Sequence, residues 1–395
     1  MTARAGIHSS PYNFLPEVTA DDDLPASITF EDVTLREGEQ AAEIAFGLDD
    51  RVEIARRLDA VGVHQIQVGY AGDEDAAVKA IKQAGVQARL AQLLVGFKPD
   101  WRRRLESARD AGVDVIQVLY RSADGQLSHM GISREQARDR VVEIITAARE
   151  LGLPLIQFSP SFVTRADWDF LEILYRAATA AGAHQMSVAD SMGVARPAAI
   201  RYLVGRVRAL TGLPVQIHCH NDFGVGLANT LAGIEAGASS ADVAIMGLGE
   251  RTGGAPLDEL AMALEGLYGV STGIKLEALY DLSKFMERLT GVVIPPMKPV
   301  VGANCFAQKL DIHVMLTAER PDLLEPYEPK LVGNHRALRL GRGSGPLAVK
   351  AKLRELGLSL EEAKLDTVVA RINAESITQR SFITDDAFRA FVREA

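Results

Sequence analysis

Two short polar motifs place side chains that can bind a metal ion near the ends of apolar runs. His218 and His220 end one such run, and Arg36 and Glu37 follow the run ITFEDV (28–33). Histidines at positions i and i+2 of a strand point to the same side, so they can share one ion. Two imidazoles and one carboxylate leave open coordination positions for a substrate. The sequence therefore predicts a divalent metal site made by Glu37, His218 and His220.

These motifs belong to a repeating alternation of short apolar runs and longer amphipathic segments. The runs are rich in β-branched residues and have the length of strands, whereas the longer segments have the period of helices. Eight strands are expected, at 28–33, 63–70, 88–95, 113–120, 153–159, 184–190, 213–220 and 241–248.

Glycine marks the ends of several expected helices, directly before the next strand. These glycines are Gly62, Gly112, Gly152, Gly182, Gly212 and Gly237. Glycine suits the left-handed residue that closes a helix. Eight strand–helix units in a row favour an α/β fold of the closed (β/α)8 TIM-barrel type over an open doubly wound sheet, and no GxGxxG motif follows the first run. Active sites of such barrels lie at the C-terminal ends of the strands, where both polar motifs are expected.

A barrel takes roughly 250 residues, so a chain of 395 residues has room for a further region. Residues 1–26 are rich in Ser, Pro and Asp and are interpreted as an N-terminal arm. The barrel is expected over 27–293. A smaller mixed α/β C-terminal region is expected over 294–395, with helical stretches around 347–357 and 360–374.

The composition of the chain indicates which kinds of partner are not expected. The net charge is −9 and the basic residues are scattered, so no nucleic-acid partner is expected. No apolar run reaches the ~20 residues that span a membrane, so no membrane partner is expected either. The two cysteines, Cys219 and Cys305, exclude a disulfide scaffold and fit a reducing cytoplasm, which is the expected location.

The segments VTLREGEQ (33–40) and HCHND (218–222) resemble a superfamily of metal-dependent barrel enzymes, the DRE-TIM metallolyases or HMGL-like enzymes. It includes isopropylmalate, homocitrate and citramalate synthases and hydroxymethylglutaryl-CoA lyase. Further segments resemble family motifs in the same order, namely VADSMG (188–193), GLGERTG (247–253), IHV (312–314), EPYEPKLVG (325–333) and GRGSG (341–345). The last three resemble the synthases rather than the lyases. The resemblance covers roughly residues 28–360 and marks a divergent member.

The resemblance implies roles for individual residues. Glu37, His218 and His220 match the metal ligands, and the metal is zinc, manganese or magnesium. Arg36 matches an arginine that stabilises the charge developing on the oxygen of a 2-oxo acid. His313 matches a histidine that assists acid–base chemistry at a thioester, usually in the barrel of a partner subunit. Ordinary packing is the alternative for His313.

The substrate pocket is expected to include further polar side chains from several strand ends. These are Gln40, His129, Gln157, Ser159 and Ser191. The hydroxyls of Ser159 and Ser191 are suited to binding the substrate carboxylate.

The sequence departs from the family pattern in the half of the site that handles the thioester. Ser161 stands where the synthases have a catalytic glutamate, and Leu324 where they have a tyrosine. Homocitrate synthases carry an arginine at the position of Gln157 to bind the far carboxylate of 2-oxoglutarate, so Gln157 argues against that substrate. Either other groups, such as His129 or Tyr120, replace the missing ones, or the second substrate differs.

The resemblance implies a Claisen-type acyltransferase that condenses acetyl-CoA, or a related acyl-CoA, with a 2-oxo acid to give a 2-substituted malate. A homodimer is expected, because His313 would act in the partner's barrel. One alternative is a carbon–carbon lyase or aldolase, or a transferase with a different donor. A non-catalytic barrel is the other, but Arg36 beside three metal ligands argues against it.

Overall fold

The computed structural model describes residues 5–395, which form two compact units. The first comprises Pro11–Val292, and the second comprises residues 5–10 together with Val293–Ala395. Residues 1–4 of the expected N-terminal arm lie outside the described residues. Within the rest of the arm, residues 11–14 and 16–19 form the short helices η1 (Pro11–Phe14) and α1 (Pro16–Thr19) rather than extended chain.

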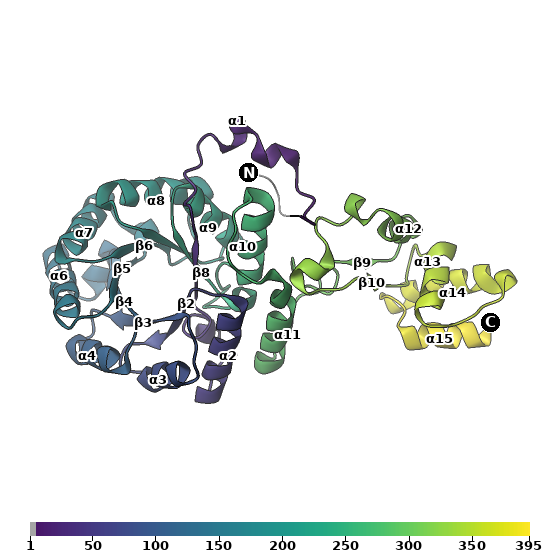
Figure 1. Ribbon diagram of the computed structural model, residues 1–395, viewed down its shortest axis with the longest axis horizontal. Helices are drawn as coiled ribbons and strands as arrows, with labels where there is room; N and C mark the ends of the chain where they lie inside the picture. The colour runs from purple at the N-terminus through teal and green to yellow at the C-terminus, as the bar shows by residue number, and fades with distance from the viewer. Residues whose placement is uncertain (1–4) are drawn as a thin grey trace. The chain divides into compact units, whose positions relative to one another are not determined.

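The first unit is a closed barrel of eight parallel strands (Figure 1). The barrel closes because β1 pairs with both β2 and β8. The strands are β1 (Thr29–Asp32), β2 (Gln65–Tyr70), β3 (Arg89–Val95), β4 (Val115–Arg121), β5 (Leu155–Ser161), β6 (Gln185–Asp190), β7 (Val215–Cys219) and β8 (Ser240–Val243). The predicted (β/α)8 barrel is thereby confirmed.

Helices alternate with the strands and surround them (Figure 1). They are α2 (Leu48–Val61), α3 (Asp75–Gln83), α4 (Trp101–Ala111), α5 (Asp124–His129), α6 (Arg134–Glu150), α7 (Trp168–Ala181), α8 (Pro197–Thr211), α9 (Gly226–Glu235), α10 (Leu257–Ala263) and α11 (Leu279–Thr290). All six glycines expected after helices have positive φ. At Gly62 a Cβ atom would lie 2.8 Å from the carbonyl oxygen of Gly273, so this helix end admits no larger residue.

The eighth strand is shorter than the predicted 241–248. It ends at Val243, and residues 245–247 form a 3-10 turn, η4, in which Met246 has a φ of 59°. This left-handed residue ends the extended backbone, so the polar segment after β8 folds as a turn across the end of the barrel.

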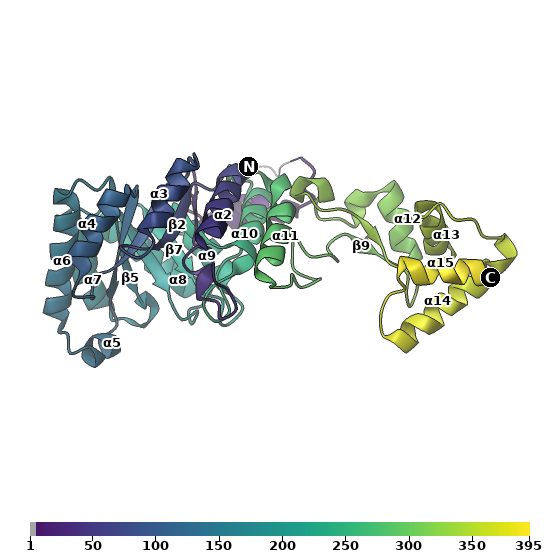
Figure 2. The same ribbon diagram turned by 90° about the horizontal axis from the view of Figure 1, so that it is seen from below.

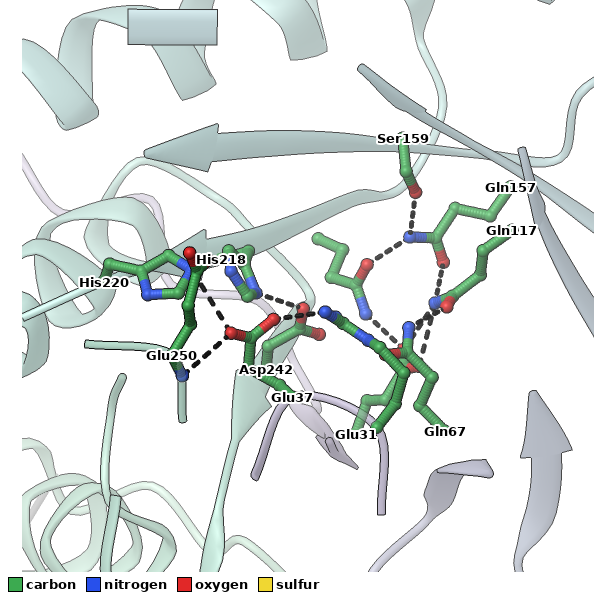
Figure 3. A network of polar contacts seen from close by, with 12 residues as sticks. Glu31, Glu37, Gln67, Gln117, Gln157, Ser159, His218, His220, Asp242 and Glu250 are labelled. Carbon is green, nitrogen blue, oxygen red and sulfur yellow. Dashed lines mark hydrogen bonds and ion pairs between the residues drawn. The ribbon is translucent and has the colours of Figure 1, made fainter. Parts of the chain in front are cut away.

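The barrel interior contains a carboxyl group surrounded by amides, and we call this set of side chains the glutamine layer. Its members are Glu31, Gln65, Gln67, Gln117, Gln157 and Gln216, all at most 3% exposed. Amide groups of Gln65 and Gln117 donate to the Glu31 carboxyl oxygens at 2.8–2.9 Å, and Gln216 donates to them as well. Figure 3 shows Gln117 beside Glu31. A buried polar group without such partners would be costly, so these strands specify one another's positions.

The second unit has its own hydrophobic core, which includes Leu340, Val349, Ile372, Phe388 and Phe391. Its elements are β9 (Ala307–Gln308), α12 (Asp311–Glu319), β10 (Ala337–Leu338), α13 (Pro346–Glu355), α14 (Leu365–Gln379) and α15 (Asp385–Glu394). The sequence predicted helices in the regions of α13 and α14 but missed α12 and α15. Figure 2 shows α14 and α15 side by side.

The glutamine layer predicts a pH dependence of stability. Burial, with the charge of Asp242, raises the pKa of Glu31 from 4.5 to about 8, against the opposing effect of the amides. The folded state thus binds this proton more tightly than the unfolded state. The free energy of unfolding should therefore fall as pH rises from about 4.5 to about 8. Relative to Glu31→Gln, wild type should lose on the order of a few kcal/mol across this window.

Urea denaturation at several pH values measures this difference. Both tryptophans, Trp101 and Trp168, lie in the barrel unit, so their fluorescence reports on its unfolding. Glu106→Gln, which removes an exposed carboxylate on α4, is the matched control and should track wild type. Parallel pH curves for wild type and Glu31→Gln would contradict the prediction.

Candidate metal centre and substrate pocket

One pocket opens at the carboxyl ends of the barrel strands, with a volume of about 330 Å³. A cavity of this size can hold a small organic acid. Seven predicted site residues line it: Arg36, Glu37, Gln40, Ser159, Ser191, His218 and His220. Their positions follow from the barrel itself, since each comes from a strand or from the turn directly after one.

Glu37, His218 and His220 form a compact cluster of possible metal ligands. One ligand atom from each lies within 4.8 Å of the others. His220 Nε2 is 3.7 Å from Glu37 Oε1, and the two imidazole rings have centroids 4.9 Å apart (Figure 3). The structure thus brings together the three residues that the sequence predicted.

Two of these residues are held in the protonation states that a metal ion requires. Burial alone would raise the pKa of Glu37, but Arg36 and the two histidines outweigh it and lower the pKa to about 2. Burial, together with the nearby His218, lowers the pKa of His220 to about 4. At neutral pH the cluster therefore offers a carboxylate and a neutral imidazole. Nε2 of His220, 3.7 Å from Glu37 Oε1, is the ring nitrogen that faces the cluster and would bind the metal, while the buried Nδ1 has no hydrogen-bond partner among the described residues.

Asp242, at the end of β8, orients the other histidine. Its Oδ2 lies 2.7 Å from His218 Nδ1 (Figure 3). Burial disfavours a charge on His218, but the contact with Asp242 outweighs it and raises the pKa of the imidazole. A carboxylate on one ring nitrogen leaves the other nitrogen free to bind a metal and fixes the ring's orientation.

The glycine-rich turn after β8 (residues 247–253) contacts Glu37 and helps to fix its position. The amide N–H of Glu250 donates to Glu37 Oε1 at 3.2 Å. The turn is tight, because a Cβ atom on Gly253 would lie 1.8 Å from the carbonyl oxygen of Gly247. Arg251 in the same turn pairs with Asp222 at 2.8 Å, tying the turn to the segment after β7.

Arg36 is fixed from two sides. Its Nη1 pairs with Glu37, and its Nε donates to Gln67, which in turn donates to Gln117 in the glutamine layer (Figure 3). Burial would lower the pKa of Arg36, but Glu37 outweighs it and the pKa is raised. The charged guanidinium of Arg36 is thus already fixed beside Glu37, His218 and His220 before any ligand binds.

The predicted substrate residues lie at different depths. Ser159 and Ser191 line the pocket, whereas Gln157 lies beneath it, fully buried, and donates to Ser159 Oγ at 3.0 Å. Ser191 Oγ accepts a hydrogen bond from the backbone of Phe162 at 2.9 Å. Gln40 also lines the pocket and donates to the hydroxyl of Tyr70 at 2.7 Å.

Other predicted residues are not brought to this pocket. His129 is exposed on α5, and Tyr120 is buried against Phe97; neither lines the pocket. His313 lies on α12 of the second unit, so its role in catalysis stays a prediction. Ser161 does line the pocket.

Sequence reasoning missed three contributors: Asp242, the glutamine layer and Arg121. Asp242 and Arg121 are charged residues at strand ends, which was an available signal. The glutamines recur at the same place in the similar runs IQV (66–68), IQV (116–118) and IQF (156–158). That repetition indicated a shared inward-facing layer.

Comparison with known proteins gives the class. A model described as HMGL-like matches residues 27–286, and one described as homocitrate synthase post-HMGL domain-like matches residues 300–380. The chain is 38% identical over 389 residues to homocitrate synthase AksA of Methanopyrus kandleri, covering 97% of this chain and 96% of that protein. The chain belongs to the HMGL-like family.

A further relative agrees with this assignment, and a solved structure agrees with the fold. The chain is 35% identical over 349 residues to 2-isopropylmalate synthase of Sulfolobus acidocaldarius, covering 87% of this chain and 89% of that protein. The crystal structure of the Bacillus subtilis HMG-CoA lyase superposes with a TM-score of 0.61 at 19% identity, over 70% of this chain and 98% of that chain. This structural likeness concerns the fold. Within residues 5–395, no helix is both long and apolar enough to cross a membrane.

The cluster predicts one divalent ion per chain. His218→Ala and His220→Ala should each lose the ion and the activity while keeping the fold, because each removes one of three protein ligands. Elemental analysis measures the bound metal, and circular dichroism shows whether the fold is kept. His184→Ala is the control, since this imidazole precedes β6 at the opposite end of the strands and should leave metal content unchanged. Full turnover after exhaustive chelation would contradict the prediction.

Proposed function

We propose that this protein is an acyltransferase that condenses acetyl-CoA, or a related acyl-CoA, with a 2-oxo acid to form a 2-substituted malate. The observation that carries the proposal is the grouping of Arg36 with Glu37, His218 and His220 around one pocket. The names of the relatives, homocitrate and 2-isopropylmalate synthases, support the same class of reaction.

Different residues of the pocket bind the oxo acid and activate it. A divalent ion bound by Glu37, His218 and His220 would act as a Lewis acid toward the 2-oxo group. Arg36, charged and held in place, stabilises the negative charge that develops on that oxygen when the new carbon–carbon bond forms. The hydroxyls of Ser159 and Ser191 line the same pocket and are available to the acid's carboxylate.

The second candidate is a related enzyme with a different donor or a carbon–carbon lyase. It is favoured by Ser161, which leaves the position of the family's glutamate without a carboxylate. General acid–base help contributes typically about 10²–10⁴-fold, so an acyltransferase of this kind needs another group for proton removal. By resemblance, His313 is the remaining candidate.

A thiol-release assay with acetyl-CoA and a panel of 2-oxo acids tests the proposal. Wild type should release free coenzyme A with at least one acid, and Arg36→Ala should lower kcat about 10²–10³-fold while metal content stays constant. Because Gln157 is neutral and buried, 2-oxoglutarate should be a poor acceptor in this panel. Its use should rise in Gln157→Arg, which supplies the missing cation at β5.

The outcomes of this assay are separable. No coenzyme A release with any acid, from metal-loaded protein, would refute the acyltransferase proposal. If wild type used 2-oxoglutarate better than every other acid, the interpretation of Gln157 would be wrong while the proposed class of reaction would stand.

A homodimer with composite sites follows from the proposed role of His313. Arg36→Ala and His313→Ala chains should each be inactive, and their mixture should regain part of the activity, because a heterodimer assembles one site with both residues intact. Subunit exchange is verified first by tagged pull-down, and mass photometry gives the oligomeric state. A mixture that stays inactive after complete exchange would show that His313 does not act in the partner's barrel.

A further inference from the structure

Three arginines line the pocket, and they differ in how their charge is compensated. Arg36 pairs with Glu37, and Arg251 pairs with Asp222. Arg121, the last residue of β4, has no carboxylate within ion-pairing distance anywhere in residues 5–395. Accordingly, carboxylates raise the pKa of the first two, whereas burial lowers the pKa of Arg121.

The guanidinium of Arg121 is nevertheless held in a defined place. Its Cζ lies 4.8 Å from the ring centroid of Phe97 and 5.6 Å from that of Phe162. Such stacking fixes the plane of a guanidinium and leaves its N–H groups at the edge available for an anion. Of its five N–H donors, the one hydrogen bond within the described chain is from Nη1 to Ser161 Oγ, at 3.4 Å.

The backbone at Phe162, whose ring lies against the guanidinium of Arg121, adopts a strained conformation. Phe162 has a φ of 63°, in the left-handed region that non-glycine residues seldom adopt. The conformation is stabilised by Ser191 Oγ, which accepts the amide N–H of Phe162. Residues held in this way against their preference are concentrated at functional sites.

Ser161 and Arg121 are partners in the register of β5 and β4. Ser161 donates its hydroxyl to the carbonyl oxygen of Tyr120 at 3.3 Å, so it is occupied by the backbone and adds no charge. A carboxylate here would neutralise the guanidinium. Because the residue is a serine, the positive charge of Arg121 remains available to the pocket.

The position of Arg121 in the barrel indicates what it faces. Around the closed sheet, β4 is three strands from β1 and three from β7, which lead into Glu37 and carry His218. Arg121 therefore lies across the pocket from the metal cluster. Its partner Ser161 is also four residues closer to the carboxyl end of β5 than Gln157, nearer the pocket's mouth.

We propose that Arg121 binds an anionic group, such as a carboxylate, on the tail of the oxo acid whose 2-oxo group lies at the metal cluster. The acceptor is then a dianion with its second charge near the mouth of the pocket, above the level of Gln157. This inference rests on the proposed function for the assignment of the oxo acid to the cluster. The phosphates of an acyl-CoA are the other possible source of such an anion.

The test compares oxo acids that end in a carboxylate with the matching terminal amides, at three chain lengths, so that charge changes while shape is kept. Wild type should prefer the best carboxylate over its amide by about 10- to 100-fold in kcat/KM. Arg121→Met should reduce this preference to less than about threefold, mainly by raising KM for the acid. Ser161→Glu should reduce it as well, by neutralising the guanidinium, and Arg121→Lys should keep part of it.

Arg206→Met is the matched control. Arg206, on α8, also stacks on two rings, those of Trp168 and Tyr202, and donates to a hydroxyl, but it does not line the pocket. It should keep the full preference. An equal loss of activity toward acid and amide in Arg121→Met would overturn the proposal in favour of a packing role. A raised KM for acetyl-CoA with an unchanged preference would overturn it in favour of the donor's phosphates.

Calorimetric titration separates this inference from the proposed function. The chain of 395 residues, loaded with Mn²⁺, is titrated with acid or amide in the absence of any acyl-CoA. Tighter binding of the acid, lost in Arg121→Met and kept in Arg206→Met, supports the anion site even if no condensation is catalysed. Equal affinities of acid and amide for wild type would contradict it whether or not the enzyme turns over.

Discussion

The buried carboxyl group of Glu31 is the constraint on which the site depends. A charge or a polar proton at the centre of a barrel needs partners, and neighbouring strands supply them as glutamine amides. The same amides extend to Gln67, which holds Arg36, and through Gln157 to Ser159. The polar interior thus transmits a fixed geometry from the barrel core to the residues that face the pocket.

Charge is distributed unevenly over the pocket above this layer. On the side of β1, β7 and β8, carboxylates, imidazoles and Arg36 compensate one another, which keeps Glu37 ionised and His220 neutral. On the side of β4 and β5, serines and aromatic rings surround one arginine. In the proposed function the first side is preorganised for a metal and an oxo group, and the anion proposed to bind Arg121 would compensate the charge of the second side.

The sequence predicted the parts that local patterns determine. Glycines such as Gly62 and Gly182 mark helix ends by a property of one residue, and His218 with His220 follow from the period of a strand. Contacts across strands were harder to predict. The pairing of His218 with Asp242, 24 residues apart, depends on the register of β7 and β8. Likewise, Phe162 reaches Arg121 only because its backbone adopts a left-handed conformation that no local pattern indicated.

Ser161, the departure from the family pattern that lines the pocket, stands on the side of β4 and β5, where a change of side chain is tolerated for a physical reason. Replacing Glu37 or Arg36 would disturb a connected network of hydrogen bonds that reaches down to Glu31. Ser161 and Arg121, by contrast, contact mainly backbone, aromatic rings and each other at the ends of their strands. Side chains there can change without leaving buried polar groups of the glutamine layer unpaired. The grouping of Arg36 with Glu37, His218 and His220 can therefore be kept while side chains at the ends of β4 and β5 change.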